Sequence, residues 1–511
     1  MSPDMRKMGP LPRVGRFLKE WSLYPWLFAI FPVLDLYARN IKETAPITML
    51  LPLALSLALA LLVWLAARAV SRQSRKASLT TLLFCLMFFS YGHLSVLLGL
   101  PPWTVYLWAA TFLFAAFIIL RTHRDFSVWT PRLNIFAAVL VIFVAVQVAW
   151  AWTHPSSHTP SLTQLDEDAR LSERNLLPSG MPDIYYLILD RYANEKVLKS
   201  EFGFDNSEFL DFLRAKGFFV AADSQCNYPQ THMSLASSLN MDYIDRAQGE
   251  RAAGSGYVYQ LLKDSRVLRL LRSLGYTSIH LGSWFEGTSF NPYADLNLGG
   301  AGIRRYWNDF FQKFVGTTAL RPWSSGHFFH PRQRDRILQQ FAELERMPAR
   351  RGPKFVFAHV LVTHPPYVFG PNGEDPGTGK GFTYLDQLRY ANARLSRLID
   401  TLQKGSSPPP VIILQSDEGP KPGGAVVQVK GKKRRIRWSP GRESPEQKRV
   451  HHPILNALGF PGADMKVLYP SISPVNTFRV LFNLYFGTRY RLLPDETRDS
   501  SGEGAFDDTA E

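Results

Sequence analysis

Two acidic motifs in this chain stand directly after stretches that are typical of buried β-strands. One is Asp190, which ends the run 183–190 (DIYYLILD), and the other is Asp417-Glu418, which follows the run 411–415 (VIILQ). An Asp in this position commonly caps the next helix. Two acids at strand ends, the second followed by Glu-Gly, can instead hold a hard cation. The local pattern leaves both interpretations open.

The segments around these acids alternate between strand and helix patterns. Strands are predicted at 183–190, 218–221, 277–281, 354–362 and 411–415, and helices at 206–216, 257–274 and 384–403. This alternation predicts an α/β fold with a mostly parallel sheet. In open sheets of this kind the ligand site lies beyond the carboxyl ends of the strands. Asp190 and Asp417 both stand at such ends.

The first 153 residues have the composition of a membrane domain. A helix needs about 20 apolar residues to cross the hydrocarbon core of a bilayer. Three uncharged stretches meet that length: 44–67, 77–120 and 133–153. The second stretch is long enough for two spans joined at Pro101-Pro102, and a weaker stretch at 21–38 is interrupted by Asp35. We therefore expect an N-terminal α-helical domain of about five spans.

The distribution of charge predicts how these spans are oriented. Basic residues occupy the loops after the second and fourth spans: Arg68, Arg72, Arg75, Lys76, Arg121, Arg124 and Arg132. The intervening turn at 99–103 carries no charge. Because basic loops stay in the cytoplasm, the fifth span exits outward. We expect a multi-pass protein of the inner or plasma membrane whose C-terminal domain is extracytoplasmic.

Composition and charge divide the chain of 511 residues into four predicted regions. The predicted regions are a transmembrane domain at 1–153, a linker at 154–180, an α/β domain at 181–495 and a disordered acidic tail at 496–511. Residues 1–153 have a net charge of +9 and the rest of the chain +6, so much of the basic excess lies beside the spans. The bilayer is thus an expected partner and nucleic acid is not.

Two further features have open or negative interpretations. The basic stretch 430–449 is either a solvated loop or a contact for anionic lipid headgroups or a polyanionic glycan. The two cysteines, Cys85 and Cys226, are too few for a disulfide-stapled fold or a multi-cysteine zinc site. Charge and cysteine content therefore exclude some classes of protein but do not identify a function.

The order of several short motifs resembles a known superfamily. After Asp190 come the segments 227–240 (NYPQTHMSLASSLN), 363–369 (THPPYVF), 416–419 (SDEG) and 468–479 (LYPSISPVNTFR). In this order they resemble the sulfatase-like branch of the alkaline phosphatase superfamily. With the spans in front, the chain resembles membrane sulfatase-like proteins related to lipoteichoic acid synthases and phosphoethanolamine transferases. The resemblance covers roughly residues 181–495.

This resemblance implies an alkaline-phosphatase-like domain with one divalent metal ion, which can be Mn²⁺, Mg²⁺ or Zn²⁺. The implied metal ligands are Asp190, Thr231, Asp417 and Glu418. Thr231 is also the implied nucleophile, and His364 is expected to contact the anionic group or leaving oxygen of the substrate. The implied protein is a metal-dependent phosphotransferase or phosphodiester hydrolase that acts on an anionic lipid or glycan of the envelope.

Two residues depart from the pattern of this family. Glu418 stands where His is usual, and Arg191 stands where Gly is common, where it can obstruct the site or hold phosphate. One alternative is therefore a catalytically inactive domain that binds or scaffolds envelope components. Another is a true sulfatase, but the sequence after Cys226 does not match the Cys/Ser-x-Pro-x-Arg motif. His359, which alternates along a predicted strand, is interpreted as structural.

Overall fold

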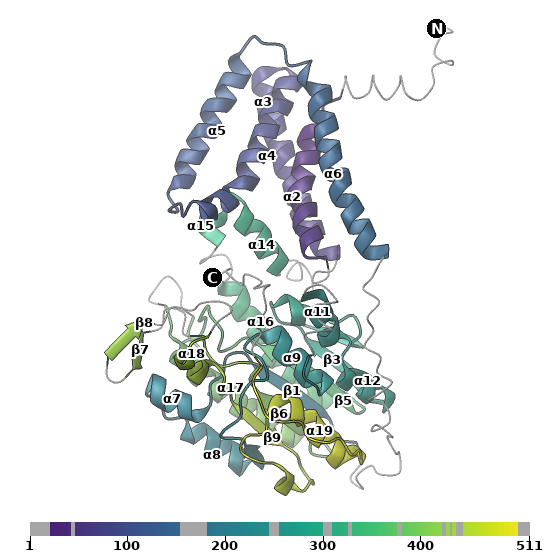
Figure 1. The fold of residues 1–511 in the computed structure, drawn as a ribbon, viewed down its shortest axis with the longest axis vertical. Helices are drawn as coiled ribbons and strands as arrows, with labels where there is room; N and C mark the ends of the chain where they lie inside the picture. Colours follow the sequence, from purple (N-terminus) through teal and green to yellow (C-terminus); the bar gives the residue numbers. More distant parts are fainter. Residues whose placement is uncertain are drawn as a thin grey trace. The chain divides into compact units, whose positions relative to one another are not determined.

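The structure is a computed structural model, and it describes the greater part of the chain (Figure 1). The described residues are 21–41, 46–153, 181–244, 255–299, 309–324, 330–375, 381–421, 426–429, 432–435 and 443–498. Contacts divide the chain into a first unit, 1–157 with 303–329, and a second unit, 158–302 with 330–511. The predicted linker at 154–180 lies outside the described residues.

The described part of the first unit is a bundle of apolar helices. Its long helices are α2 (Tyr24–Arg39), α3 (Leu50–Ser71), α4 (Ser74–Leu97), α5 (Thr104–Arg121) and α6 (Trp129–Thr153). Four described segments are long and apolar enough to cross a membrane: Pro46–Ser71, Ser74–Leu97, Thr104–Arg121 and Trp129–Ala151. The chain is thus a membrane protein with an α-helical N-terminal region. Helix α2, with 16 residues, is shorter than these four, so a fifth span and the orientation stay predictions.

A buried amide joins the beginnings of α2 and α6. Asn134 Oδ1 on α6 accepts hydrogen bonds from the backbone N–H groups of Leu23 and Tyr24, at 2.8 and 2.9 Å. The amide nitrogen of Asn134 donates to the carbonyl of Trp21 at 2.7 Å. The first N–H groups of a helix have no partner within the helix. Asn134 therefore satisfies α2 from a neighbouring helix and sets the two helices side by side.

A later segment of the chain completes the first unit. Helix α14 (Asp309–Thr317) packs Phe314 against Phe89 of α4, with ring centroids 5.9 Å apart. The backbone N–H of Ala319 donates to the carbonyl of Phe88 at 2.7 Å. A Cβ on Gly92 would lie 2.2 Å from the carbonyl oxygen of Gly316, so this close approach requires glycine. The predicted boundaries include this segment in the α/β domain, whereas its contacts group it with the bundle.

The second unit is built on a sheet of the order β2-β9-β6-β1-β5-β3-β4. Its strands are β1 (Ile184–Leu189), β2 (Phe218–Val220), β3 (Thr277–Leu281), β4 (Leu296–Leu298), β5 (Lys354–Val360), β6 (Val411–Gln415) and β9 (Asn456–Gly459). Strand β9 is antiparallel to both β6 and β2, and the other pairs are parallel. The predicted mostly parallel α/β sheet is confirmed.

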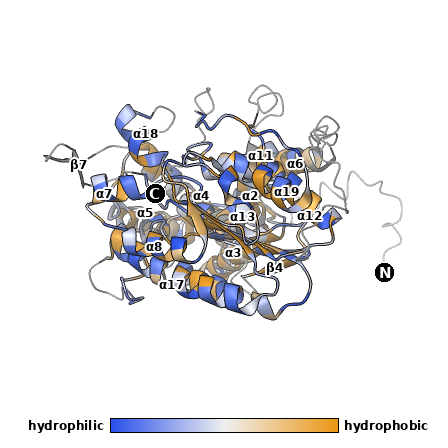
Figure 2. Ribbon diagram, turned by 90° about the horizontal axis from the view of Figure 1, so that it is seen from below, coloured by the Kyte–Doolittle hydropathy of each residue, from blue (hydrophilic) through white to orange (hydrophobic). Residues whose placement is uncertain are grey.

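Helices cover both faces of this sheet. One face packs against α7 (Glu195–Phe202), α8 (Ser207–Ala215), α16 (His330–Glu345) and α17 (Tyr384–Gly405). The other packs against α9 (Thr231–Asn240), α11 (Ser255–Lys263), α12 (Arg266–Ser273) and α19 (Pro474–Phe486). Figure 2 shows the strands mainly in orange, whereas α8 and α17 carry both colours. Double coverage explains why the strands are continuously apolar.

The helices α11 and α12 replace the single helix predicted at 257–274. Ser265 lies between them and accepts a hydrogen bond from the N–H of Leu268 at 3.4 Å, which caps α12. A Ser side chain that caps a helix marks its beginning. The apolar periodicity continues through the break because both helices pack against the same face of the sheet.

Candidate metal centre

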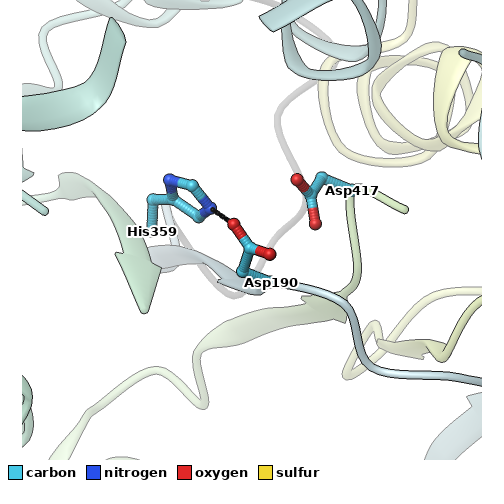
Figure 3. Close-up of side chains that lie close together, drawn as sticks. All are labelled: Asp190, His359 and Asp417. Atoms are coloured by element: carbon cyan, nitrogen blue, oxygen red, sulfur yellow. Dashed lines mark hydrogen bonds and ion pairs between the residues drawn. The ribbon is translucent and has the colours of Figure 1, made fainter. Parts of the chain in front are cut away.

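Three neighbouring strands bring Asp190, His359 and Asp417 to one edge of the sheet. Strands β1 and β6 are parallel, with Ile188 opposite Gln415, so the acids that follow them emerge together. Strand β5 flanks β1 on the other side, with His359 opposite Ile188. One ligand atom from each of Asp190, His359 and Asp417 lies within 4.8 Å of the other two (Figure 3).

The polar atoms of this cluster are buried and incompletely paired. Relative exposure is 2% for Asp190, 0% for His359 and 1% for Asp417. His359 Nε2 lies 3.1 Å from Asp190 Oδ2. Within the described part of the chain, Asp190 Oδ1 and Asp417 Oδ2 have no hydrogen-bond partner. Because an unpaired buried carboxylate oxygen is costly, these two atoms fit a bound cation, and a mixed oxygen and nitrogen set suits Zn²⁺ or Mn²⁺.

The two carboxylates influence one another's ionisation. Burial, followed by the charges of Asp190 and Glu418, raises the pKa of Asp417 to about 7. Burial opposes ionisation of Asp190 as well, but His364, His359 and Arg191 outweigh it, and the pKa of Asp190 is lowered. Like charges this close disfavour the doubly ionised state. A cation between them would relieve that repulsion.

Thr231 is the first residue of α9 and lies beside Asp417. Its hydroxyl hydrogen-bonds the Asp417 carboxylate and lowers the pKa of that group. Ser234, one turn later on α9, donates to the Asp417 carbonyl at 2.7 Å and ties the helix to the loop after β6. The N-cap position belongs to Gln230. Thr231 is therefore not explained as a helix cap.

The two departures from the family pattern contact each other. Arg191 Nε lies 3.3 Å from Glu418 Oε1 and 3.9 Å from Asp190 Oδ1. Lys421 Nζ lies 3.2 Å from Glu418 Oε1, and His451 Nε2 lies 3.5 Å from Glu418 Oε2. Glu418 thus belongs to an ion-pair cluster of Arg191, Lys421 and His451, and these groups hold the pKa of its buried carboxyl well below the usual range although burial opposes this.

The backbone explains why Gly suits position 191. Arg191 has a φ of 61°, in the left-handed region that favours glycine. A non-glycine residue there costs about 1–3 kcal/mol. The ion pair with Glu418 holds Arg191 in this conformation.

His364 lies near the cluster but is not one of its three members. Its ring meets Trp284 edge-on, with centroids 5.3 Å apart. Burial and then the charge of Arg191 lower the pKa of His364 to about 4, although Asp190 acts in the opposite direction. The imidazole is therefore neutral at pH 7.

His359 is the site residue that sequence reasoning missed. It alternates with Phe355 and Phe357 on the face covered by α9, which supported a structural interpretation. The available signal was its place near the end of a strand predicted beside Asp190. Recognising it requires the strand order, because only the pairing of β5 with β1 sets His359 against Asp190.

Other sequence candidates lie around the cluster or outside the described residues. His451 ends helix α18 (Pro445–His451), and both His451 and His452 contact the carboxylate of Glu443. Burial raises the pKa of the Cys226 thiol well above its usual range, so this thiol is neutral. In the basic stretch 430–449, the side chains of 430–442 lie outside the described residues.

A family model identifies the family to which this chain belongs. The profile of the sulfatase family matches residues 186–451. No curated protein is similar enough in sequence to count as a match.

Three solved structures to which this chain is similar have TM-scores below 0.5. Lipooligosaccharide phosphoethanolamine transferase A (EptA), an integral membrane protein from Neisseria meningitidis, is 13% identical, with 92% of this chain and 95% of that chain covered and a TM-score of 0.36. The lipoteichoic acid synthase LtaP from Listeria monocytogenes is 13% identical, with 66% and 80% covered and a TM-score of 0.41. The C-terminal periplasmic domain of EptC from Escherichia coli, in complex with Zn, is 14% identical, with 60% and 84% covered and a TM-score of 0.39.

Proposed function

Because this chain belongs to the sulfatase family, we propose that it is a membrane-anchored, metal-dependent phosphotransferase or phosphodiester hydrolase. The proposed substrate is an anionic lipid or glycan of the cell envelope, and the proposed nucleophile is Thr231. One observation carries the proposal. The Thr231 hydroxyl hydrogen-bonds Asp417, and Asp417 and Asp190 each have one buried oxygen without a hydrogen-bond partner in the described part of the chain.

The chain's own residues position the reacting groups. Attack forms a bond between Thr231 Oγ and phosphorus and breaks the bond from phosphorus to the leaving oxygen, which takes up a proton from solvent. The proton of Thr231 passes to Asp417, the carboxylate that already accepts its hydrogen bond. Water or an acceptor alcohol then releases the group from Thr231. A cation held by Asp190 and Asp417 would favour the Thr231 alkoxide and neutralise charge on the phosphoryl oxygens.

Positive groups near Thr231 support binding of an anionic substrate. Thr231 begins a helix of 10 residues, so a phosphoryl group on it meets the N–H groups and the positive dipole end of α9. Arg191 and Lys421 place two positive charges beside Glu418, and Arg191 also faces Asp190. With the carboxylates of Asp190 and Asp417 counted, a net positive charge toward a phosphate requires the bound cation.

Trapping the transferred group on Thr231 tests this proposal. The full-length protein in detergent is incubated with Mn²⁺ or Zn²⁺ and a generic phosphodiester, and peptides are analysed by mass spectrometry. We expect a phosphoester on Thr231 and its absence in Thr231→Ala. Thr231→Val is the matched control, because it keeps the shape of the side chain and removes the hydroxyl. Turnover that survives in both variants would exclude Thr231 as the nucleophile.

A second candidate is a catalytically inactive domain that binds or scaffolds envelope components. The observation that favours it is Arg191, whose buried Nε lies 3.9 Å from Asp190 Oδ1 and can compete there with a cation. This candidate predicts that the purified full-length protein neither retains a divalent cation after dialysis nor turns over a phosphodiester. A true sulfatase receives no support, because the residues after Cys226 do not match the Cys/Ser-x-Pro-x-Arg motif.

The proposed location of the α/β domain is outside the cytoplasm, beyond five spans. The basic loops after the second and fourth predicted spans support this orientation. Protease added to intact spheroplasts should digest the domain without prior lysis. Digestion that requires lysis would reverse the orientation.

A further inference from the structure

The proposed function leaves the cation's side-chain ligands to be chosen among several residues. Sequence reasoning implies Glu418 as a ligand, whereas the described residues that come within ligand distance of one another are Asp190, His359 and Asp417. The two candidates for the third side-chain ligand, His359 and Glu418, differ in the side chains that they already contact. These contacts decide between the two candidates.

Glu418 is committed to neighbouring cations. One carboxylate oxygen contacts Arg191 at 3.3 Å and Lys421 at 3.2 Å, and the other faces His451 at 3.5 Å. The Glu418 side chain is 1% exposed. Moving it onto a metal would leave buried positive groups without their counter-charge, and breaking a buried ion pair in this way is strongly unfavourable.

His359 is held for coordination by a pair of hydroxyls. Its Nδ1 lies 2.8 Å from Thr288 Oγ1, and Thr288 Oγ1 lies 2.8 Å from Ser283 Oγ. Ser283 Oγ in turn accepts from the backbone N–H of Phe285 at 3.0 Å. His359, Thr288 and Ser283 are each 0% exposed. This arrangement directs Nε2, the other ring nitrogen, toward Asp190.

We infer that His359, rather than Glu418, completes the cation site with Asp190 and Asp417, and that Thr288 and Ser283 are the residues that position its ring. The inference rests on the proposed metal-dependent function and specifies its ligands. It also gives Arg191 and Glu418 a joint role. Glu418 stands at the position of a family metal ligand, and Arg191 neutralises its charge, so the pair adds no net charge to the site. Thr288 and Ser283 act through His359 and are positioning residues.

The hydroxyl pair accommodates both tautomers of the ring. An ionised carboxylate only accepts hydrogen bonds, so in the contact with Asp190 the proton is on Nε2 and Nδ1 accepts from Thr288. If Nε2 held a cation, Nδ1 would carry the ring proton and could donate it to Thr288, whose own hydroxyl could then donate to Ser283. Either atom of the Thr288–Ser283 contact can be the donor.

The loop that carries Thr288 is fixed by its own hydrogen bonds. The N–H of Ser283 donates to the carbonyl of Thr288 at 3.1 Å, and His280 Nε2 of β3 lies 2.8 Å from the same oxygen. Phe285 packs edge-on against the His359 ring, with centroids 6.1 Å apart. A ligand held by such outer contacts binds metal more tightly, and losing one outer partner typically costs 10–100-fold in affinity.

Nitrogen coupling in Mn²⁺ pulsed EPR tests the inference directly. The full-length protein is labelled with ¹⁵N-histidine, stripped with a chelator in detergent and loaded with Mn²⁺ alone. We expect a ¹⁵N coupling in the wild type that disappears in His359→Gln, which keeps a hydrogen-bonding side chain. The coupling should persist in the double variant Arg191→Gln/Glu418→Gln, the matched control, because that variant removes both charges and leaves the net charge of the site unchanged.

Affinities measured on the same samples separate ligand from positioning roles. The Mn²⁺ dissociation constant should rise at least about 100-fold in His359→Gln and about 10-fold in Thr288→Val. Thr288→Ser should restore affinity because it restores the hydroxyl. The double variant should change affinity less than Thr288→Val does.

The outcomes distinguish the inference from the function on which it rests. Mn²⁺ bound to the wild type without ¹⁵N coupling, or coupling that survives His359→Gln, would overturn the role of His359 while leaving metal-dependent catalysis intact. Loss of affinity in the double variant but not in His359→Gln would restore Glu418 as the ligand. A wild type that binds neither Mn²⁺ nor Zn²⁺ would overturn both proposals.

Discussion

The two units of this chain differ in how much apolar surface they expose and in how their buried polar groups are paired. In the bundle, large apolar side chains such as Leu97 and Phe114 are 79% and 68% exposed, as expected for helices whose solvent is lipid. In the α/β unit both faces of the sheet are covered, and β1 is buried along its whole length. Helices in lipid gain little from burying apolar surface. The bundle instead depends on close contacts such as Gly92 with Gly316 and on hydrogen bonds such as those of Asn134.

The buried polar groups of the two units differ in whether their hydrogen bonds are satisfied. Asn134 in the bundle makes three hydrogen bonds to backbone groups of another segment. Asp190 and Asp417 in the α/β unit each have an oxygen without a hydrogen-bond partner in the described part of the chain. A satisfied buried group stabilises the fold, whereas an unsatisfied one is retained at a cost and marks a candidate site.

Replacing Asp417 should separate stability from function most strongly. Asp417→Asn removes a buried charge that Asp190 opposes, so the metal-free protein should gain stability, by roughly 1–3 kcal/mol. The same change should lower phosphodiester turnover at least about 100-fold, because a proposed ligand and proton acceptor is lost. Thermal unfolding in detergent with a chelator, and turnover with Mn²⁺, measure the two effects. A less stable metal-free variant would show that Asp417 is structural, like Asn134.

Enlarging Gly92 should break the packing that the bundle depends on. In Gly92→Leu the new Cβ would meet the carbonyl oxygen of Gly316 at 2.2 Å, so α14 has to move. Overpacking of this kind costs about 1–3 kcal/mol or more. Proteolysis between α14 and the preceding strand β4 should accelerate in the variant. Gly99→Leu serves as the control, since nothing lies within 4 Å of a Cβ there, although its positive φ of 59° adds backbone strain.

His280 should make the stability of the α/β unit depend on pH. Burial lowers the pKa of His280 to about 4 from its usual 6.5. Between these values the unfolded chain binds a proton that the folded chain does not, so stability falls as pH decreases from 6.5 toward 4. The slope due to this group is at most about 1.4 kcal/mol per pH unit. Denaturant unfolding of wild type and His280→Gln across this range measures it, and equal slopes would contradict the assignment.

The smallest effect is expected for the amide that joins α2 and α6. Asn134→Ala leaves the first N–H groups of α2 without their acceptor, which should cost about 0.5–2 kcal/mol. Asn134→Asp keeps an acceptor for these N–H groups but loses the donor to Trp21. In thermal unfolding in detergent, the wild type should therefore have the highest unfolding temperature, and Asn134→Ala should unfold at a lower one. A variant as stable as the wild type would mean that lipid or detergent headgroups satisfy α2 instead.

Several parts of the fold and site could be predicted from particular residues. The uncharged stretches identify helices α3 to α6, and the runs before Asp190 and Asp417 identify β1 and β6. The strand after Gly275 and the helix capped by Thr383 follow from equally local signals. Strand β9 was not predicted, since its four residues, Asn456–Gly459, carry too little pattern of their own.

The sequence by itself determined most of the elements around the site, because apolar run length and helix caps act over a few residues, although it missed β9 and the break between α11 and α12. It also determined that Asp190 and Asp417 each follow a buried strand, and that the motif containing Thr231 lies between them in the sequence. Only the tertiary structure decided that His359 faces Asp190, that Arg191 pairs with Glu418 and that α14 packs against α4. These contacts join residues far apart in the chain through strand order and helix packing. No local pattern encodes such pairings, since each depends on which surfaces meet when the chain folds.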